Sequence, residues 1–145
     1  MASQASGLVR ISTNDTSYSD LVLLSGSGSM VYVSGQLAFD ENRQIVGDTL
    51  SDQAGICFDR IEALLAQVGG DLNNVVRITT YLTDLEAYPD FDNVRAARFG
   101  ESRPASTAVG VASLLFGALV EIEAIALLPA SDHREEPGST PSTHS

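Results

Sequence analysis

Two glutamates, Glu121 and Glu123, stand in the least polar stretch of the chain and are the first candidates for chemistry. A carboxylate within hydrogen-bond reach of a water molecule can take its proton and prepare it for attack on an electrophilic carbon. An acid among aliphatic residues is costly unless it is paired or hydrogen-bonded. This conflict between local pattern and burial marks a candidate functional site. The plainer alternative is that one or both acids lie on a solvated edge or pair with an arginine.

The element that must position these acids is a strand from Leu119 to Leu128, predicted by the alternation of its residues. One face carries Val120, Ile122, Ala124, Ala126 and Leu128, and the other carries Leu119, Glu121, Glu123, Ile125 and Leu127. Side chains two residues apart on a strand point the same way, about 7 Å apart along it. Both carboxylates therefore share one face with three aliphatic side chains.

The composition excludes several kinds of catalytic site. All eight basic residues are arginines, so a lysine Schiff base is impossible. His133 and His144 both lie in the polar C-terminal tail, which argues against a histidine base, a Ser-His triad or a histidine metal site, and no metal or cofactor is expected. Cys57 is the single cysteine and belongs to the apolar stripe of a predicted helix, so it is interpreted as a packed thiol. The formal net charge of −11 argues against a nucleic-acid partner.

The remaining elements predict an α+β fold, a mixed sheet with two helices packed on one of its faces. Residues 1–6 are expected to be loose, and Ser25–Ser29 is interpreted as a hairpin connection rather than a phosphate-binding loop. Arg95, next to Val94 on the second helix, is expected to be solvated. The predicted strands cover residues 8–12, 21–24, 30–34, 75–83, 106–111 and 119–128, and the predicted helices cover about 51–68, capped by Thr49 or Ser51, and 89–99.

Two helices can cover only one face of such a sheet, yet the last strand is apolar on both faces. We therefore expect the second face to be buried in a homo-oligomer, with Glu121 and Glu123 facing a neighbouring subunit. The length predicts a single domain over residues 1–130, followed by a disordered polar tail over residues 131–145. No apolar run of 18 residues and no signal pattern occur, so no membrane partner is expected and the chain is interpreted as cytoplasmic.

From about Val31 to Pro129, several segments resemble the RidA (YjgF) family of enamine/imine deaminases. The matching pieces are VYVSGQL, AQVGGDLNNVVRITTYLTDL, RFG, RPASTAVGV and VEIEAIAL. The resemblance implies a chorismate-mutase-like fold and a homotrimeric barrel with its helices outside and its sheets facing inward. It also implies three clefts between subunits that bind a small-molecule substrate. That assembly agrees with the expectation from sheet coverage.

The resemblance also assigns residues to the cleft. The family glutamate that positions water corresponds to Glu121, whereas the arginine that grips the substrate carboxylate is replaced by Ser106, and the cysteine two residues later by Ala108. The backbone near Gly35 and Thr107 could hold a carboxylate or carbonyl oxygen, although Gly35 could also mark a plain turn. Arg103 or Arg95 could replace the missing arginine from another direction. The candidate residues are thus Glu121 for catalysis and Gly35, Arg103, Ser106 and Thr107 for substrate binding.

Two functions from different classes follow. The first is a metal-free hydrolase or deaminase acting on a small imine, enamine or related reactive metabolite, with a substrate other than the usual 2-imino acids. The alternative is a non-catalytic small-molecule-binding or chaperone-like trimer that uses the same clefts, which the missing arginine favours. Ribonuclease activity, known among relatives of this fold, is a weaker option because of the acidity of the chain.

Overall fold

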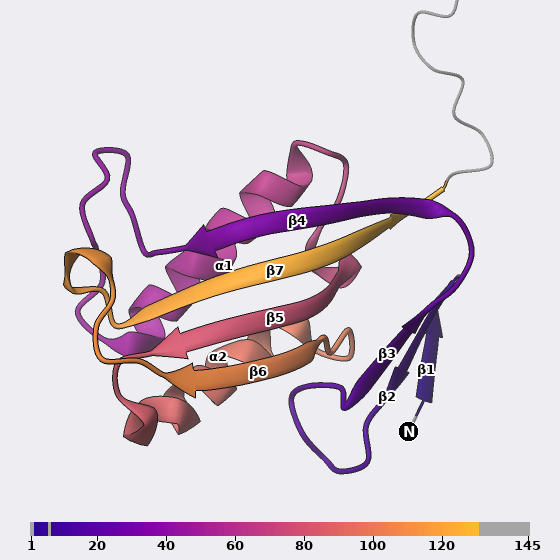
Figure 1. Ribbon diagram of the computed structural model, residues 1–145, viewed down its shortest axis with the longest axis horizontal. Coiled ribbons are helices and arrows are strands. Elements are labelled where there is room, and N and C mark those ends of the chain that lie inside the picture. The colour runs from indigo at the N-terminus through magenta and orange to yellow at the C-terminus, as the bar shows by residue number, and fades with distance from the viewer. Residues whose placement is uncertain (1, 6, 131–145) are drawn as a thin grey trace, which may run out of the picture.

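Two β-sheets and two α-helices make up the part of the chain that the structure, a computed structural model, describes, which is residues 2–5 and 7–130 (Figure 1). The larger sheet has the strand order β4-β7-β5-β6, where these strands are Gly28–Gln36, Val120–Pro129, Val75–Leu82 and Ala105–Gly110. The smaller sheet has the order β1-β2-β3, with strands Ala2–Ala5, Leu8–Ile11 and Leu21–Leu24.

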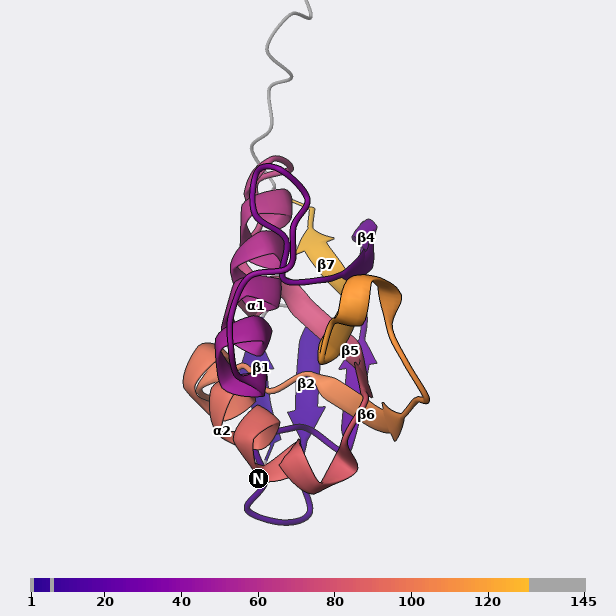
Figure 2. The same cartoon turned by 90° about the vertical axis from the view of Figure 1, so that its left-hand side faces the viewer.

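Both α-helices, α1 (Leu50–Ala66) and α2 (Tyr88–Phe99), lie on the same side of the larger sheet, as Figure 2 shows edge-on. The short 3-10 helices are η1 (Leu72–Asn74), η2 (Leu85–Ala87) and η3 (Leu115–Gly117). The predicted α+β class, a mixed sheet with two helices, is confirmed. The other face of the larger sheet carries no helix in the described part of the chain, and this uncovered side is called the open face below.

The larger sheet is mixed because of how the chain returns to it. β7 pairs antiparallel with both β4 and β5, so it lies inside the sheet. β6 pairs parallel with β5. Helix α2, which connects the two strands, returns the chain to the end of the sheet at which β5 begins. The acids of β7 are therefore flanked by β4 on one side and by β5 on the other.

Local signals in the sequence place α1 against the sheet. Thr49 caps the helix, since its side chain accepts a hydrogen bond from the backbone N–H of Asp52. The helix buries a stripe against the sheet, which includes Phe58, Ile61 and Leu65. Cys57 belongs to the same stripe, and burial raises the pKa of its thiol to about 12. The interpretation of Cys57 as a packed thiol is confirmed.

The alternation predicted for the last strand is present in β7. Its buried side chains, which face the helices, are Val120, Ile122, Ala124 and Ala126. The partly buried positions between them are Glu121, Glu123, Ile125 and Leu127, and they lie on the open face. The burial of one face by helices thus fixes which face carries the acids.

The N-terminal region differs from the sequence-based prediction in two respects. Residues Ala2–Ala5, expected to be loose, form β1 and pair antiparallel with β2. The segment after Leu24 was predicted to close a hairpin, but it passes from β3 in the smaller sheet to β4 in the larger one. A run of glycine and serine permits a turn without determining whether the flanking strands pair.

Among the described residues, no helix is long and apolar enough to cross a membrane. The tail predicted for residues 131–145 lies outside the part of the chain that the structure describes.

Candidate functional site

Glu121 stands on the open face directly against the backbone of Gly35. A Cβ atom placed on Gly35 would lie 2.8 Å from Cδ and 3.1 Å from Cγ of Glu121, closer than real side-chain atoms pack. The β4–β7 register shifts between Val33 and Gln36, next to this contact. The glycine therefore leaves the space that the Glu121 side chain occupies. The structure brings these two predicted site residues together.

The end of β4 beside Glu121 is tied to helix α1 through Gln36. Arg60 donates from Nε to Oε1 of Gln36 over 3.1 Å, and Nε2 of Gln36 donates to the carbonyl oxygen of Ser34 over 2.9 Å. The Gln36 side chain is buried. These bonds fix the backbone on both sides of Gly35, so Glu121 packs against an ordered stretch of β4.

The second acid, Glu123, has a partner on the neighbouring strand. The hydroxyl of Tyr81 donates to Oε1 of Glu123 over 2.7 Å. This hydrogen bond and the carboxylate charge beside it raise the pKa of the Tyr81 hydroxyl above its usual value. Tyr81 lies opposite Glu121 in the β5–β7 register, so its side chain leans along the sheet towards Glu123.

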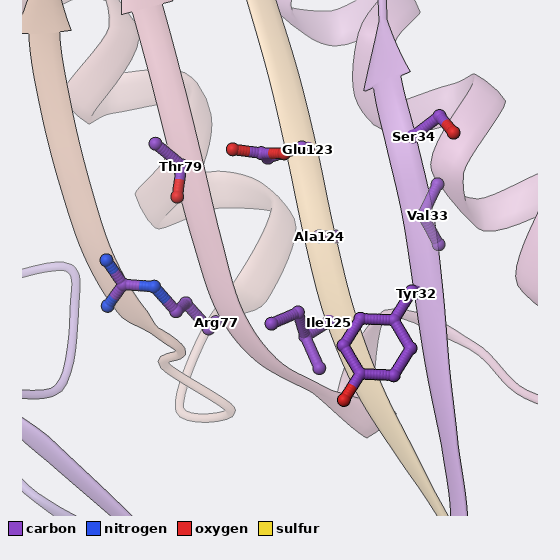
Figure 3. Close-up of a pocket in the computed structure, with 8 residues that line it drawn as sticks. All are labelled: Tyr32, Val33, Ser34, Arg77, Thr79, Glu123, Ala124 and Ile125. Atoms are coloured by element: carbon purple, nitrogen blue, oxygen red, sulfur yellow. The ribbon is translucent and has the colours of Figure 1, made fainter.

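A hollow of about 420 Å³ opens beside Glu123 on the open face (Figure 3). Its lining comes from three neighbouring strands and consists of Tyr32, Val33, Ser34, Arg77, Thr79, Glu123, Ala124 and Ile125. The hollow thus combines one guanidinium, one carboxylate, three hydroxyl side chains and an apolar wall. Glu121 is not among these residues, so the hollow is separate from the contact with Gly35.

Thr107 lies on the open face, where Arg77 donates from Nη2 to its Oγ1 over 2.9 Å. In the strand register, Thr107 is aligned with Thr79 and, through it, with Glu123 rather than with Glu121. The alternation of β5 places Arg77 on this face, but nothing in its local sequence marks it as a site residue.

Ser106 lies on the other face of the sheet. It pairs with the buried Ile78 and accepts a 2.8 Å hydrogen bond at its Oγ from Nη1 of Arg95 on α2. Arg103 lies in the connection between α2 and β6 and donates from Nε to the carbonyl oxygen of Gly100 over 3.4 Å. Within one chain, therefore, Ser106 and Glu121 do not face the same space.

Arg95 is buried, with 1% of its surface exposed, so the expectation that it is solvated is wrong. Its guanidinium donates to Ser17 and Tyr88, forms an ion pair of 2.8 Å with Asp92, and lies 4.9 Å from the ring centroid of Tyr18. The bonds to Ser17 and Ser106 join α2 to the N-terminal segment and to β6. Ser17 and Tyr18 come from the segment before β3, and the helical periodicity of α2 carries no information about these two contacts.

No group of three or more histidine, cysteine, aspartate or glutamate side chains that could hold a metal ion occurs within the described ranges. The described open face of one chain presents carboxylate, hydroxyl, guanidinium and backbone groups.

A family model described as Endoribonuclease L-PSP matches residues 11–128. The chain belongs to the RidA (YjgF, L-PSP) family. Known members similar to this chain include a RutC family protein of Pyrococcus abyssi, 39% identical over 100 residues, which span 68% of this chain and 79% of that relative. The 2-iminobutanoate/2-iminopropanoate deaminase of Bos taurus is 36% identical over 111 residues, which span 76% and 79% of the two chains.

A solved RidA-family structure has the same fold. The RidA crystal structure from the Antarctic bacterium Psychrobacter sp. PAMC 21119 superimposes with a TM-score of 0.66 at 35% sequence identity, covering 86% of this chain and 97% of that one. The similarity extends over the larger part of both chains, so the α+β architecture is that of RidA-family proteins.

Proposed function

We propose that this RidA-family protein hydrolyses a small imine, enamine or related reactive metabolite, and that Glu121 prepares the attacking water. The observation that carries the proposal is the contact of Glu121 with Gly35, which holds a carboxylate at a defined place on the open face. The family includes a 2-iminobutanoate/2-iminopropanoate deaminase, which supports the reaction class.

The reaction needs one well-placed carboxylate. Glu121 accepts a proton from water as the oxygen attacks the imine carbon, and the C=N double bond becomes a C–N single bond. The proton passes to the nitrogen, which gives a tetrahedral carbinolamine. The hydroxyl of this intermediate then gives its proton to the nitrogen, the C=O double bond forms, the C–N bond breaks and ammonia leaves. The net change is imine plus water to carbonyl compound plus ammonia. An enamine first takes a proton at carbon to become the imine.

We propose a homotrimer of the barrel type, with the open faces inward and substrate clefts between subunits. The open face exposes large apolar side chains: Tyr32 at 74%, Met30 at 42% and Val109 at 38%. Burial of such a surface favours association. Since Ser106 and Glu121 lie on opposite faces, a cleft lined by both would need contributions from two subunits.

The substrate we infer differs from the usual 2-imino acids, because the resemblance to the family implies that Ser106 takes the place of the carboxylate-binding arginine. Gly35, Thr107 and Arg103 remain the proposed substrate-binding residues besides Ser106. An Arg–carboxylate pair contributes both energy and geometry, so its loss relaxes the preference for an α-carboxylate. The same substitution favours the second candidate, a non-catalytic binding or chaperone-like trimer that uses the same clefts.

Ammonia release separates the two candidates. A panel of imines is generated in situ from several amino acids, and ammonia release is followed with wild-type protein, Glu121→Gln and a buffer blank that records spontaneous hydrolysis. Glu101→Gln is the control, because it also removes one carboxylate but does so at an exposed position. We expect wild type and Glu101→Gln to exceed Glu121→Gln by about 100-fold or more on at least one substrate. Equal rates for wild type and Glu121→Gln on every substrate would favour the binding protein.

A further inference from the structure

Helix α1 bonds to both strands that make the contact between Glu121 and Gly35, and Figure 1 shows this helix behind β4 and β7. We propose that Arg60 and Gln53 of α1 are positioning residues, which set the place of the Glu121 carboxylate through the backbone. Arg60 acts on the end of β4, and Gln53 acts on the start of β7. The inference rests on the role proposed for Glu121 and identifies the groups that hold this acid in place.

The backbone at Gly35 lies in a β-bulge. The β4–β7 register shifts after Val33, so that Ser34 and Gly35 together stand opposite one residue of β7. A bulge takes backbone groups out of the regular hydrogen-bond ladder. The Gln36 side chain supplies one replacement, since its Nε2 donates to the carbonyl oxygen of Ser34 over 2.9 Å. The conformation at Gly35 therefore depends on the direction in which the Gln36 amide points.

Arg60 determines that direction. The two ends of a glutamine amide have nearly the same shape, but the oxygen only accepts hydrogen bonds and the nitrogen only donates them. A guanidinium has no acceptor, so the amide must turn its oxygen towards it. Nε of Arg60 donates to Oε1 of Gln36 over 3.1 Å, which leaves the amide nitrogen for Ser34. Without Arg60 the amide is free to turn over, and the carbonyl of Ser34 loses its donor.

The Arg60 guanidinium is itself held in place by an aromatic ring. It lies 5.6 Å from the ring centroid of Phe39, within the distance of a cation–π contact. Arg43 lies over the same ring at 4.8 Å, yet the donor to Gln36 is Arg60. The two arginines thus share one ring and differ in the bond that leads to Gly35.

Gln53 fixes the other strand. Its Oε1 accepts a 2.9 Å hydrogen bond from the backbone N–H of Leu119, two positions before Glu121. Its Nε2 donates to the carbonyl oxygen of Gly47 over 3.0 Å, so both ends of this buried amide have partners. A buried amide that is satisfied at both ends has one preferred orientation. The backbone that leads into β7 is therefore fixed from α1 as well.

The helical repeat brings both groups to one side of α1. Gln53 and Arg60 are seven positions apart, which is about two turns of 3.6 residues. The thiol of Cys57 lies between them and is affected by both charges: burial chiefly raises its pKa, the Arg60 charge lowers it, and the Glu121 charge raises it. All of these bonds join elements of one chain, so they do not depend on how the open face is covered.

Nuclear magnetic resonance on the full chain tests the positioning in Arg60→Met and Gln53→Met. Methionine keeps an unbranched side chain but has neither the guanidinium nor the amide. We expect both variants to shift the carboxyl carbon signal of Glu121. Amide hydrogen exchange should rise about tenfold at residues 34–36 in Arg60→Met and at Leu119 in Gln53→Met, because each loses a local hydrogen bond.

Three further variants separate positioning from a general loss of packing. Arg43→Met removes the other arginine over Phe39 and should leave the Glu121 signal unchanged. Arg60→Lys keeps a charged donor and should restore most of the wild-type signal. Urea unfolding shows which variants are folded, and Arg60→Gln, whose shorter side chain cannot reach the Gln36 oxygen, replaces Arg60→Met if that variant does not fold.

Steady-state kinetics on an imine that wild type hydrolyses give a second readout. A misplaced general base slows the chemical step, so Arg60→Met should lower kcat about tenfold with little change in KM. Because Arg60 acts through Gln36, the double variant with Gln36→Met should be no slower than the slower single one.

Unchanged Glu121 signals in both Arg60→Met and Gln53→Met would overturn the proposal, as would an equal shift in Arg43→Met. The signals need no substrate, so a displaced Glu121 in a protein that releases no ammonia would support the positioning and reject the hydrolysis. Ammonia release that is lost in Glu121→Gln but unchanged in Arg60→Met and Gln53→Met would support the hydrolysis and reject the positioning.

Discussion

The carboxylate-bearing side chain of Glu121 fills the space next to Gly35 that a methyl group would require. A Cβ at Gly35 would lie 2.8 Å from Cδ of Glu121, so both cannot keep their present positions. Because Cδ itself is in the clash, rotation of the carboxylate group alone does not relieve it, and the Glu121 side chain must move as a whole. The acid and the glycine therefore act as one structural unit.

Gly35→Ala is expected to displace Glu121 and reduce ammonia release about as strongly as Glu121→Gln does, with a small loss of folding stability because the atoms that must move belong to a flexible side chain. Initial rates and urea unfolding check both effects. If the proposed role is correct, the double variant should be no slower than either single one.

Gly55→Ala provides the matched control, because a Cβ there meets nothing within 4 Å and the residue lies inside α1. Alanine in a helix interior should raise the free energy of unfolding by about 1 kcal/mol and leave the rate unchanged. A Gly35→Ala protein with wild-type activity would show that the contact has no role in catalysis.

Arg95→Gln should be strongly destabilising. The buried guanidinium joins Ser17, Ser106 and Tyr88 to Asp92, and truncation leaves these partners without their donor. A buried polar group left without its partner costs about 1–3 kcal/mol, whereas Asp92 is partly exposed and keeps its bond from Ser17. Chemical denaturation measures the loss.

Arg98→Gln is the comparison for Arg95. Arg98 also lies on α2, but its side chain is 24% exposed and its partners Asp59 and Glu62 are more exposed still. Exposed pairs contribute about 1 kcal/mol or less, so this variant should lose clearly less stability. Equal losses in the two variants would contradict the structural role given to Arg95.

Asp92 should make folding stability depend on pH. Hydrogen bonds from Ser17 and then Arg95 hold the pKa of the Asp92 carboxyl below its usual value. A lowered folded-state pKa stabilises the fold above the unfolded pKa of about 4, and this contribution is lost as the pH falls towards the folded value. Wild type should therefore exceed Asp92→Asn in unfolding free energy at pH 7, with the gap closing below about pH 4. Urea titrations from pH 7 to pH 3 measure this difference in unfolding free energy. A difference that stays constant over this range would contradict the lowered pKa of Asp92.

Where a helix or strand buries one face, the sequence pattern correctly predicted which residues lie on that face. The alternation of β7 and the apolar stripe of α1 are both present, because a shift by one position would expose the whole apolar set. β6 gave no such information, since Ser106, Thr107 and Ala108 are all small and none has a strong preference for burial. Its orientation became clear only from the pairing of Ser106 with Ile78.

Local sequence patterns could not predict contacts between segments that are distant along the chain. Arg95 receives partners from residues near Tyr18, more than seventy positions earlier in the chain, and no periodicity connects them. Arg77 could be assigned to one face of β5 from the sequence, but its neighbours Thr107 and Glu123 depended on strand order. The same limit explains the incorrect hairpin, because a turn does not determine which sheet the next strand joins.

Tyr32→Glu should prevent self-association without unfolding the subunit. The side chain is 74% exposed on the open face, so a charge there costs little in an isolated chain and much in an apolar contact between chains. Leu64→Glu is the control, because this partly exposed leucine lies on α1, outside the open face. Light scattering at micromolar concentration should give a trimer for wild type and Leu64→Glu, and a smaller species for Tyr32→Glu. A monomeric wild type would remove the basis for clefts between subunits.

Ser106→Arg and Thr107→Arg, two neighbouring substitutions, should have opposite consequences. An arginine at position 106 projects towards the buried guanidinium of Arg95, so like charges meet and the fold should lose stability. An arginine at position 107 projects from the open face near Arg77, where solvent reduces the repulsion. We expect Ser106→Arg to lower the unfolding midpoint clearly more than Thr107→Arg does. Equal midpoints would contradict the position of residue 106 beside Arg95.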